Sequence, residues 1–303
     1  MIKEVTVPAP AKINLHLAVG SLRPDGYNDI ASIFQAVSFY DSVHVALRGQ
    51  MGITLDAACN CASNKNTAYK AADGFLNAAA RNGLEPVPGV HIVIEKRIPM
   101  GAGLGGGSSD AASTLKALSL LLPGFVGNDE LYRIAGVVGS DVPFFLGSAC
   151  AAVTGRGEKI TPLAARENYS VVILDPGFSI ATKEAYHSVD AYRDRSRASP
   201  ERSWMEPEWN LEDAVDAYAR LEPEAWPFRN DFYDAVSELY PDLTGCYESL
   251  TRTGALFVSM SGSGSALYGL YASPADAKRA MMELSARYAA TIAFPLAWLP
   301  LSI

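Results

Sequence analysis

The residues with the clearest chemical meaning are five glycines within the range 101–107. An alternating apolar run at 90–94 precedes them and predicts a β-strand. The Ser-Ser-Asp that follows offers Ser108 or Ser109 as a helix N-cap, and 111–122 is rich in helix formers. A glycine loop that leads into a helix presents unpaired N–H groups at the positive end of the helix dipole. The pattern therefore predicts a site for an anion, most naturally phosphate.

Two common phosphate motifs do not fit this loop. A Walker loop needs Lys and then Ser or Thr after its last glycine, whereas Gly107 is followed by Ser-Ser-Asp. Gly101, Gly103 and Gly106 match G-x-G-x-x-G, but the acidic ribose anchor expected about 20 residues later is missing. At that distance, 118–125 indicates a helix end and a Pro-Gly turn. The loop is therefore predicted to be of another kind.

Composition sets the limits of the fold and of its partners. The chain has 303 residues, of which 49% are hydrophobic and 19% charged, enough for about two domains with a substantial core. Its net charge of −8, without a block of Lys or Arg, argues against nucleic acid as a partner. There is no membrane-spanning apolar run and no signal-peptide pattern, so we expect a cytoplasmic protein without a membrane partner. The composition specifies no oligomeric state.

The cysteines predict neither a disulfide framework nor a zinc site, because they are few and their spacing fits neither. We expect them to be structural or incidental, as reduced thiols usually are in the cytosol. They are Cys59, Cys61, Cys150 and Cys246.

Near the amino terminus, alternating residues predict strands at 5–7 and 13–19, with a kink forced by two prolines between them. Lys12 and Asn14 would share one face of a regular strand. A lone lysine is usually solvated, so this pattern alone would leave Lys12 on the surface.

The next segments lead back to the glycine loop. A Pro-Asp-Gly turn presents Tyr27 at its exit. An apolar segment and a strand are expected within 31–47, then a polar irregular stretch at 50–65 and a helix at 66–82.

Asp141 stands in a Gly-Ser turn directly before Val-Pro-Phe-Phe, between a predicted helix at 128–138 and a predicted strand at 149–153. Its carboxylate would lie at the edge of an apolar wall. Cap statistics alone make a structural N-cap as reasonable as a functional role. Thr-Gly-Arg-Gly-Glu at 154–158 predicts a tight turn.

A second unit begins with the buried-strand pattern at 171–174, and we place the domain boundary so that the domains are 1–165 and 166–303. The charged, serine-rich stretch at 193–207 is expected to be a mobile loop. The mixture of elements predicts an α+β fold whose second unit is of the split β-α-β kind. Helices are predicted at 211–221, 231–239 and 274–288, and strands at 254–260 and 266–271.

Three segments resemble, in order, the signatures of the GHMP small-molecule kinases. They are A-P-A-K-I-N-L at 9–15, P-M-G-A-G-L-G-G-G-S-S-D-A-A at 99–112 and S-G-S-G-S at 261–265, of which the first two are specific. The resemblance spans nearly the whole chain. It implies a two-domain α+β fold, with a ribosomal protein S5 domain 2-like N-terminal domain and a ferredoxin-like C-terminal domain.

Further segments resemble the members that act on a cytidine-diphosphate-linked methylerythritol: R-P-D-G-Y at 23–27, G-S-D-V-P-F-F at 139–145 and N-D-F at 230–232. The resemblance implies transfer of phosphate from ATP, with Mg²⁺, to the 2-hydroxyl of that substrate, a step towards isoprenoid precursors. Asp141 matches the catalytic aspartate and Lys12 the lysine beside it. A carboxylate can accept the proton of the alcohol, while a lysine keeps that carboxylate ionised and offsets charge on the phosphoryl group.

The resemblance also implies binding residues. The cytidine diphosphate part would lie against Asn14, Tyr27, Asn28 and Tyr186, with the two tyrosines stacked on the cytosine. Asn28 departs from the family, which has histidine there; its amide can donate and accept hydrogen bonds but reaches less far. Asn66 and Lys96 would lie near the adenine. The nucleotide positions are Asn66, Lys96, Pro99, Gly101, Gly103, Leu104, Gly105, Gly106, Gly107, Ser108 and Ser109.

Two alternatives remain beside this interpretation. One is a GHMP kinase that acts on another small alcohol, which the missing histidine at position 28 would suit. The other is a non-catalytic binding module, since the expected N-terminal fold also occurs in an RNA-binding ribosomal protein. The acidic net charge and the Lys12–Asp141 pair argue against the second.

Overall fold

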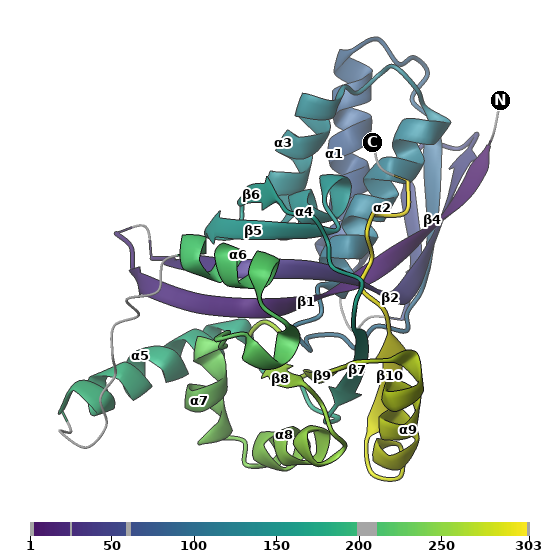
Figure 1. Cartoon of the computed structure of the whole chain (residues 1–303). Helices are drawn as coiled ribbons and strands as arrows, with labels where there is room; N and C mark the ends of the chain where they lie inside the picture. Colours follow the sequence, from purple (N-terminus) through teal and green to yellow (C-terminus); the bar gives the residue numbers. More distant parts are fainter. Residues whose placement is uncertain (1–2, 25, 59–61, 199–210, 302–303) are drawn as a thin grey trace.

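The computed structural model describes residues 3–24, 26–58, 62–198 and 211–301. A six-stranded sheet, here the first sheet, has the order β3-β4-β2-β5-β6, with β1 paired to β2 (Figure 1). Its neighbours are antiparallel except for the parallel pair β3 and β4. The strands are β1 (Glu4–Leu22), β2 (Asn28–Arg48), β3 (Ile53–Ala57), β4 (Gly89–Glu95), β5 (Cys150–Gly155) and β6 (Lys159–Pro162).

Helices cover one face of the first sheet and bury a core rich in alanine, which lets α1 and α2 approach closely. They are α1 (Thr67–Arg81), which follows the short turn Ser63–Lys65, then α2 (Gly106–Leu121), α3 (Asn128–Val138) and α4 (Val142–Gly147).

The second sheet confirms the predicted split β-α-β unit, because its order is β10-β7-β9-β8 and all neighbours are antiparallel. Its strands are β7 (Ser170–Asp175), β8 (Phe257–Met260), β9 (Leu267–Tyr271) and β10 (Ala289–Ala293). Its helices are α5 (Thr182–Ala198), α6 (Leu211–Arg220), α7 (Asp231–Ser237), α8 (Asp242–Arg252) and α9 (Pro274–Leu284), with a short turn at Pro223–Ala225.

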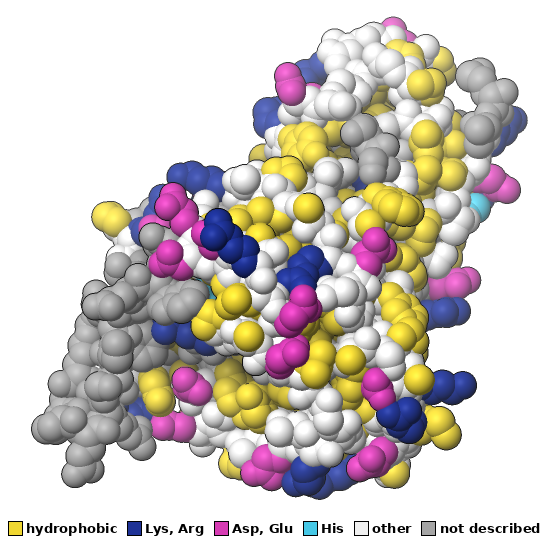
Figure 2. Space-filling model, in the orientation of Figure 1, with side chains coloured by type: hydrophobic (Ala, Val, Ile, Leu, Met, Phe, Trp, Pro, Cys, Tyr) yellow, Lys and Arg dark blue, Asp and Glu magenta, His cyan; other side chains and the backbone are white. Residues whose placement is uncertain are grey.

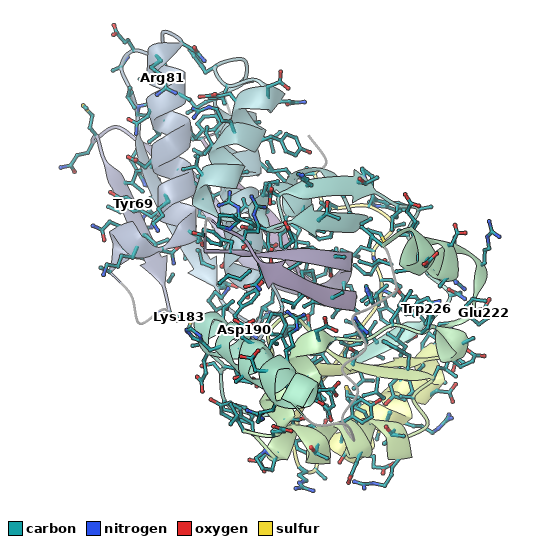
Figure 3. The ribbon with its side chains drawn as sticks, turned by 90° about the vertical axis from the view of Figure 1, so that its left-hand side faces the viewer. Tyr69, Arg81, Lys183, Asp190, Glu222 and Trp226 are labelled. Atoms are coloured by element: carbon teal, nitrogen blue, oxygen red, sulfur yellow. The ribbon has the colours of Figure 1, made fainter. Side chains whose placement is uncertain are left out.

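The two sheets face each other across a second core, to which β1 contributes Ala11, Ile13 and Leu15. A third core lies between the second sheet and its own helices. The molecule is therefore layered as helices, first sheet, second sheet and the helices α8 and α9, while α6 contributes to the core between the sheets. In Figure 3, Lys183 and Asp190 mark α5, which lies below the strands of the first sheet as part of the lower unit.

After β10 the chain crosses back to the first sheet and runs beside α2 (Figure 1). Leu296 N–H donates to Ala36 O at 2.9 Å, and Leu299 is buried in the core beneath the helices. The buried amine of Lys116, on α2, donates to Pro300 O at 3.0 Å. The last described residues are thus part of the N-terminal half of the molecule.

Several predicted elements differ from those observed. β1 is one strand rather than two, because it has a partner strand on one side only and prolines are tolerated on such strands. The stretch at 50–65, predicted to be irregular, contains β3, and α5 extends to Ala198, so part of the predicted loop at 193–207 is helical. The rest of that loop, at 199–207, lies outside the described residues.

The described helices include none long and apolar enough to cross a membrane. Figure 2 shows acidic and basic side chains interspersed over the visible face. Of the cysteines, Cys150 and Cys246 are buried free thiols, whereas Cys59 and Cys61 lie outside the described residues.

Candidate active site

An irregularity in β1 decides which way its polar side chains point. Val7 and Ala9 belong to the core under the helices, whereas Ala11 belongs to the core between the sheets. Pairing with β2 shifts register between these points, at Pro10/Ala11. Such an irregularity re-aims the side chains that follow. Lys12 consequently faces the helix side, with its Nζ 4.9 Å from the ring centroid of Phe34.

Lys12 is almost completely buried, contrary to what the strand pattern alone predicts. Its Nζ donates to Asn14 Oδ1, which also accepts from the backbone N–H of Gly262 at 2.8 Å. Burial lowers the pKa of Lys12, and the nearby charge of Asp141 opposes that shift. Asn14 thus fixes the amine of Lys12 and ties it to the C-terminal glycine loop.

Asp141 occupies the N-cap position of α4, but its side chain makes no capping hydrogen bond. Asp141 therefore lacks the hydrogen bond that defines a structural N-cap. The next residues, Val142 and Phe144, are buried in the core. The carboxylate lies beside the backbone of Gly157, in the turn that follows β5. Its chain neighbours and this turn therefore hold Asp141 at a cavity wall.

The glycine loop at 101–107 has the shape that an anion site requires. Gly101, Gly103 and Gly105 have φ values of +69°, +79° and +72°, which favour glycine strongly. A Cβ on Gly105 would lie 3.0 Å from Lys12 Cγ and 3.1 Å from the Phe145 ring. The backbone of this loop therefore packs directly against Lys12.

The helix after the loop begins earlier than predicted. α2 starts at Gly106 with left-handed Gly105 as its N-cap, so Ser108 and Ser109 lie inside its first turns instead of capping it. A glycine at φ +72° can end the loop without a side-chain cap. The Ser-Ser pattern, which is typical of an N-cap, therefore indicated a helix start that is too late. The first helical bond is donated by Ser109 to Gly105 O, so the unpaired N–H groups at the helix start belong to the glycines and to Ser108.

A buried ionic cluster lies beneath the loop. Lys96 Nζ donates to Asp41 Oδ2, and to Asp110 Oδ2 at 2.8 Å. Asp41 Oδ1 also accepts from the backbone N–H groups of Arg97 and Ile98, at 2.6 and 2.8 Å. The cluster joins β2, the end of β4 and the first turns of α2, so it fixes the base of the loop.

Two carboxylates share one lysine in this cluster, and this shifts the pKa values of Asp110 and Lys96. Burial raises the pKa of Asp110 to about 7, with Lys96 opposing and Asp41 adding to the shift. Burial disfavours the charge on Lys96, but the two carboxylates outweigh it and raise its pKa. Asp110 Oδ1 and Ser109 Oγ are buried and find no hydrogen-bond partner among the described residues.

The Ser-Gly-Ser-Gly-Ser loop at 261–265 packs against the first glycine loop. Ser261 Oγ donates to Gly103 O at 2.9 Å, and a Cβ on Gly103 would overlap the carbonyl oxygen of Ser261. Asn230 Nδ2 donates to Met260 O at 2.6 Å and to Gly262 O at 2.8 Å. The Asn-Asp-Phe segment therefore holds the second loop in place.

Two cavities meet at these loops. The loop cavity has a volume of about 420 Å³ and the Lys12 cavity about 330 Å³, and Gly103 and Gly105 line both. The loop cavity is lined by Ala57, Lys65, Asn66, Thr67, Lys96, Pro99, Met100, Gly101, Ala102, Gly103, Leu104, Gly105, Gly106, Gly107, Ser108 and Asp110. The Lys12 cavity is lined by Lys12, Asn14, Leu17, Tyr27, Ile30, Phe34, Gly103, Gly105, Ser140, Asp141, Arg156, Thr182, Tyr186, Phe232, Gly262 and Ser263.

The sequence-predicted residues divide between these cavities. Ten of the eleven predicted nucleotide residues line the loop cavity, and Ser109 is buried behind it. Lys12, Asp141, Asn14, Tyr27 and Tyr186 line the Lys12 cavity.

Asn28 is placed differently from the other predicted substrate residues. It is buried, and its Nδ2 donates to Gly20 O at 3.1 Å, a carbonyl that also accepts from Arg193. Asn28 is not among the lining residues of the Lys12 cavity. Its amide therefore holds the end of β1 beside the turn that carries Tyr27.

Sequence reasoning missed several lining residues. Lys65 was assigned to an irregular stretch, Thr182 to no role, and Arg156 to a simple turn. The single arginine between two glycines in Thr-Gly-Arg-Gly-Glu was the signal that could have identified Arg156.

The fit to a nucleotide can be tested on the loop cavity itself. Its volume lies within the usual range of about 300–1,000 Å³ for small-molecule sites, and its floor is a helix N-terminus. Within the described ranges, no three His, Cys, Asp or Glu side chains are grouped as a metal cage. Mg²⁺ fits such a site because it commonly takes only one or two protein ligands beside phosphate oxygens and water.

Comparisons with known proteins agree with this geometry. The profile of the GHMP kinases N terminal domain matches residues 66–149, and that of the GHMP kinases C terminal domain matches 214–290. A 4-diphosphocytidyl-2-C-methyl-D-erythritol kinase of Desulfotalea psychrophila is 37% identical over 268 residues, covering 87% of this chain and 84% of the relative. The chain belongs to the GHMP kinase family. A kinase of the same name from Prosthecochloris aestuarii is 35% identical and covers 95% of this chain and 96% of its own.

Solved GHMP kinase structures extend the comparison. The crystal structure of a 4-(cytidine 5'-diphospho)-2C-methyl-D-erythritol kinase matches with a TM-score of 0.79 at 36% identity, covering 96% of this chain and 99% of the other. A homoserine kinase from Cytophaga hutchinsonii matches with a TM-score of 0.70 at 17% identity, covering 100% and 96% of the two chains, which shows a common fold alone. The α+β GHMP kinase fold predicted from the sequence is thereby confirmed.

Proposed function

We propose that this GHMP kinase transfers the γ-phosphoryl group of ATP to the 2-hydroxyl of 4-diphosphocytidyl-2-C-methyl-D-erythritol, in the cytoplasmic route to isoprenoid precursors. Relatives at 32–37% identity that span most of the chain carry the name of this kinase. The observation that carries the chemistry is the meeting of two cavities at Gly103 and Gly105, with Lys12 and Asp141 in one of them.

In this proposal the nucleotide phosphates lie in the loop cavity. The N–H groups at the start of α2 and the positive end of its dipole would hold them. Mg²⁺, when bound with ATP, supplies charge neutralisation across the phosphates. The close packing of Gly105 on Lys12 would bring the terminal phosphate to the opening between the cavities.

The acceptor alcohol would lie in the Lys12 cavity. Asp141 accepts the hydroxyl proton as the new oxygen–phosphorus bond forms and the bond from the γ-phosphorus to the β,γ-bridging oxygen breaks, leaving ADP. Lys12, fixed by Asn14, interacts with the charge of this carboxylate and offsets negative charge on the moving group. Tyr27 and Tyr186 would hold the cytosine by stacking.

A second candidate is a GHMP kinase for another small alcohol, which the placement of Asn28 outside the Lys12 cavity favours. A coupled assay of ADP release separates the two. Purified protein would be given ATP and Mg²⁺ with the cytidine-diphosphate-linked methylerythritol, homoserine, mevalonate or galactose. Turnover with the first alone is the expected result. Turnover with another alcohol and not with the first would replace the proposed substrate.

A further inference from the structure

Arg156 has no role in the chemistry above, yet its side chain lies in the Lys12 cavity. The residue forms the tip of the turn between β5 and β6, flanked by Gly155 and Gly157 with φ values of +70° and +114°. Its backbone N–H donates to Glu158 Oε2 at 2.6 Å, which fixes the turn. The guanidinium carbon lies 4.9 Å from the ring centroid of Tyr27. The turn therefore brings a cation to the face of an aromatic ring proposed to stack on the base.

The charged side chains that line the Lys12 cavity do not balance. Its charged lining residues are Lys12, Asp141 and Arg156. The amine of Lys12 donates a hydrogen bond to Asn14 Oδ1 and interacts electrostatically with the carboxylate of Asp141. No carboxylate in the described part of the chain forms an ion pair with the Arg156 guanidinium, which is exposed at the cavity wall. One positive charge is thus left over in a cavity proposed to receive a diphosphate.

We infer that Arg156 binds the diphosphate of the substrate, an inference that rests on the proposed function. A diphosphate ester carries about two negative charges, and the planar guanidinium fork suits phosphate oxygens better than any other side chain. In the structure without substrate the guanidinium lies on the Tyr27 ring, a weak and reversible interaction for an exposed pair. When the cytosine stacks on that ring, the guanidinium moves to the phosphates next to it. One residue thereby links recognition of the base to recognition of the charge.

The test compares Arg156→Gln, Arg156→Lys and the control Arg287→Gln. Arg287 is an exposed arginine that also lies over a tyrosine ring, at 5.2 Å from Tyr288, and lines neither cavity. Arg156→Gln should raise KM for the cytidine-diphosphate-linked substrate roughly tenfold or more, with KM for ATP unchanged. Arg156→Lys should keep part of the affinity because its charge remains without the fork. Arg287→Gln should behave as the parent.

Calorimetry with cytidine and with CDP then identifies the group that Arg156 contacts. The parent should bind CDP more tightly than cytidine. In Arg156→Gln the ratio of the two affinities, CDP over cytidine, should fall about tenfold. Equal weakening of both ligands would overturn the inference, since the guanidinium would then act on the base or on Tyr27. Unchanged KM and unchanged preference in an active Arg156→Gln would also overturn it. A parent inactive on the cytidine-linked alcohol would instead remove the proposed function.

Discussion

Ser261 donates its hydroxyl hydrogen to the carbonyl oxygen of Gly103 at 2.9 Å, across 158 residues of sequence. The contact joins the last glycine loop to the first, and Gly103 has no room for a side chain on that side. The glycine loop at 101–107 in the N-terminal half therefore takes its shape partly from a loop in the C-terminal half. A substitution that disturbs this contact, in either loop, should therefore lower the affinity for the nucleotide.

Gly103→Ala tests this directly. A Cβ there would overlap a backbone oxygen, which cannot turn aside as a flexible side chain can, so the loop must shift. We expect ATP affinity to fall at least tenfold by calorimetry, since a shift of about 1 Å at a preorganised site is costly. The control is Gly124→Ala, which has a similar φ of +85° but open space around it. It should lose roughly 1 kcal/mol of unfolding free energy and keep ATP affinity. Equal ATP binding in both variants would show that the contact does not shape the site.

Asp141→Asn tests the proton acceptor. Asparagine keeps the size of the side chain, and no capping hydrogen bond is lost. We expect kcat to fall by roughly 10²-fold or more while ATP binding and thermal unfolding stay as in the parent. Asp242→Asn, in the first turn of α8 and away from both cavities, is the control for removal of one carboxylate near a helix N-terminus. Turnover of Asp141→Asn within a few-fold of the parent would remove Asp141 as the base.

The cluster under the loop should make stability depend on pH. Asp110 has a raised pKa of about 7 against an ordinary value of 3.8, so between these values the folded chain keeps a proton that the unfolded chain releases. Its contribution is therefore complete below about pH 4 and is lost as pH rises through about 7. Relative to Asp110→Asn, the parent should lose a few kcal/mol of unfolding free energy over this range, at about 1.4 kcal/mol per pKa unit. Urea unfolding of both proteins at several pH values measures the difference. Parallel stability curves would contradict it.

Asn28→Ala separates two roles for the residue that departs from the family. Because its amide is bonded to Gly20 O beside the Tyr27 turn, we expect KM to rise by the equivalent of about 1–2 kcal/mol, with KM for ATP unchanged. A positioning role predicts the same rise for cytidine- and uridine-diphosphate-linked substrates. A direct contact with the base would instead lower the preference for cytidine, and Asn28→His would then restore it. Unchanged KM for both substrates would exclude either role.

Local patterns were enough to predict much of this molecule. Glycines after an alternating strand predicted a tight loop that leads into a helix, and α3 spans the predicted range. They failed where tertiary structure overrides local preference. β3 alternates between apolar and polar residues, but it is only five residues long and none of them is fully buried, so the polar residues around it concealed the strand. α2 begins at a left-handed glycine, which statistics on serine caps could not indicate.

The candidate site was harder to predict because most of its order is long-range. Strand alternation alone would have exposed Lys12, whereas the register shift of its strand and the packing of Gly105 and Gly262 from two distant loops explain its burial. The chemistry of Lys12 and Asp141 came from family resemblance and stays a prediction, as does the domain boundary at 165. Arg156 was missed because turn chemistry explains its neighbouring glycines without any ligand.

The return of the last residues to the first sheet has a consequence for synthesis on the ribosome. Leu299 completes the core beneath the helices, and Pro300 O satisfies the buried amine of Lys116. A nascent chain that has emerged only as far as β6 lacks both groups, so the core of its N-terminal half is still incomplete beside α2. That half is made first, but its core can be completed only after the last described residues have been made.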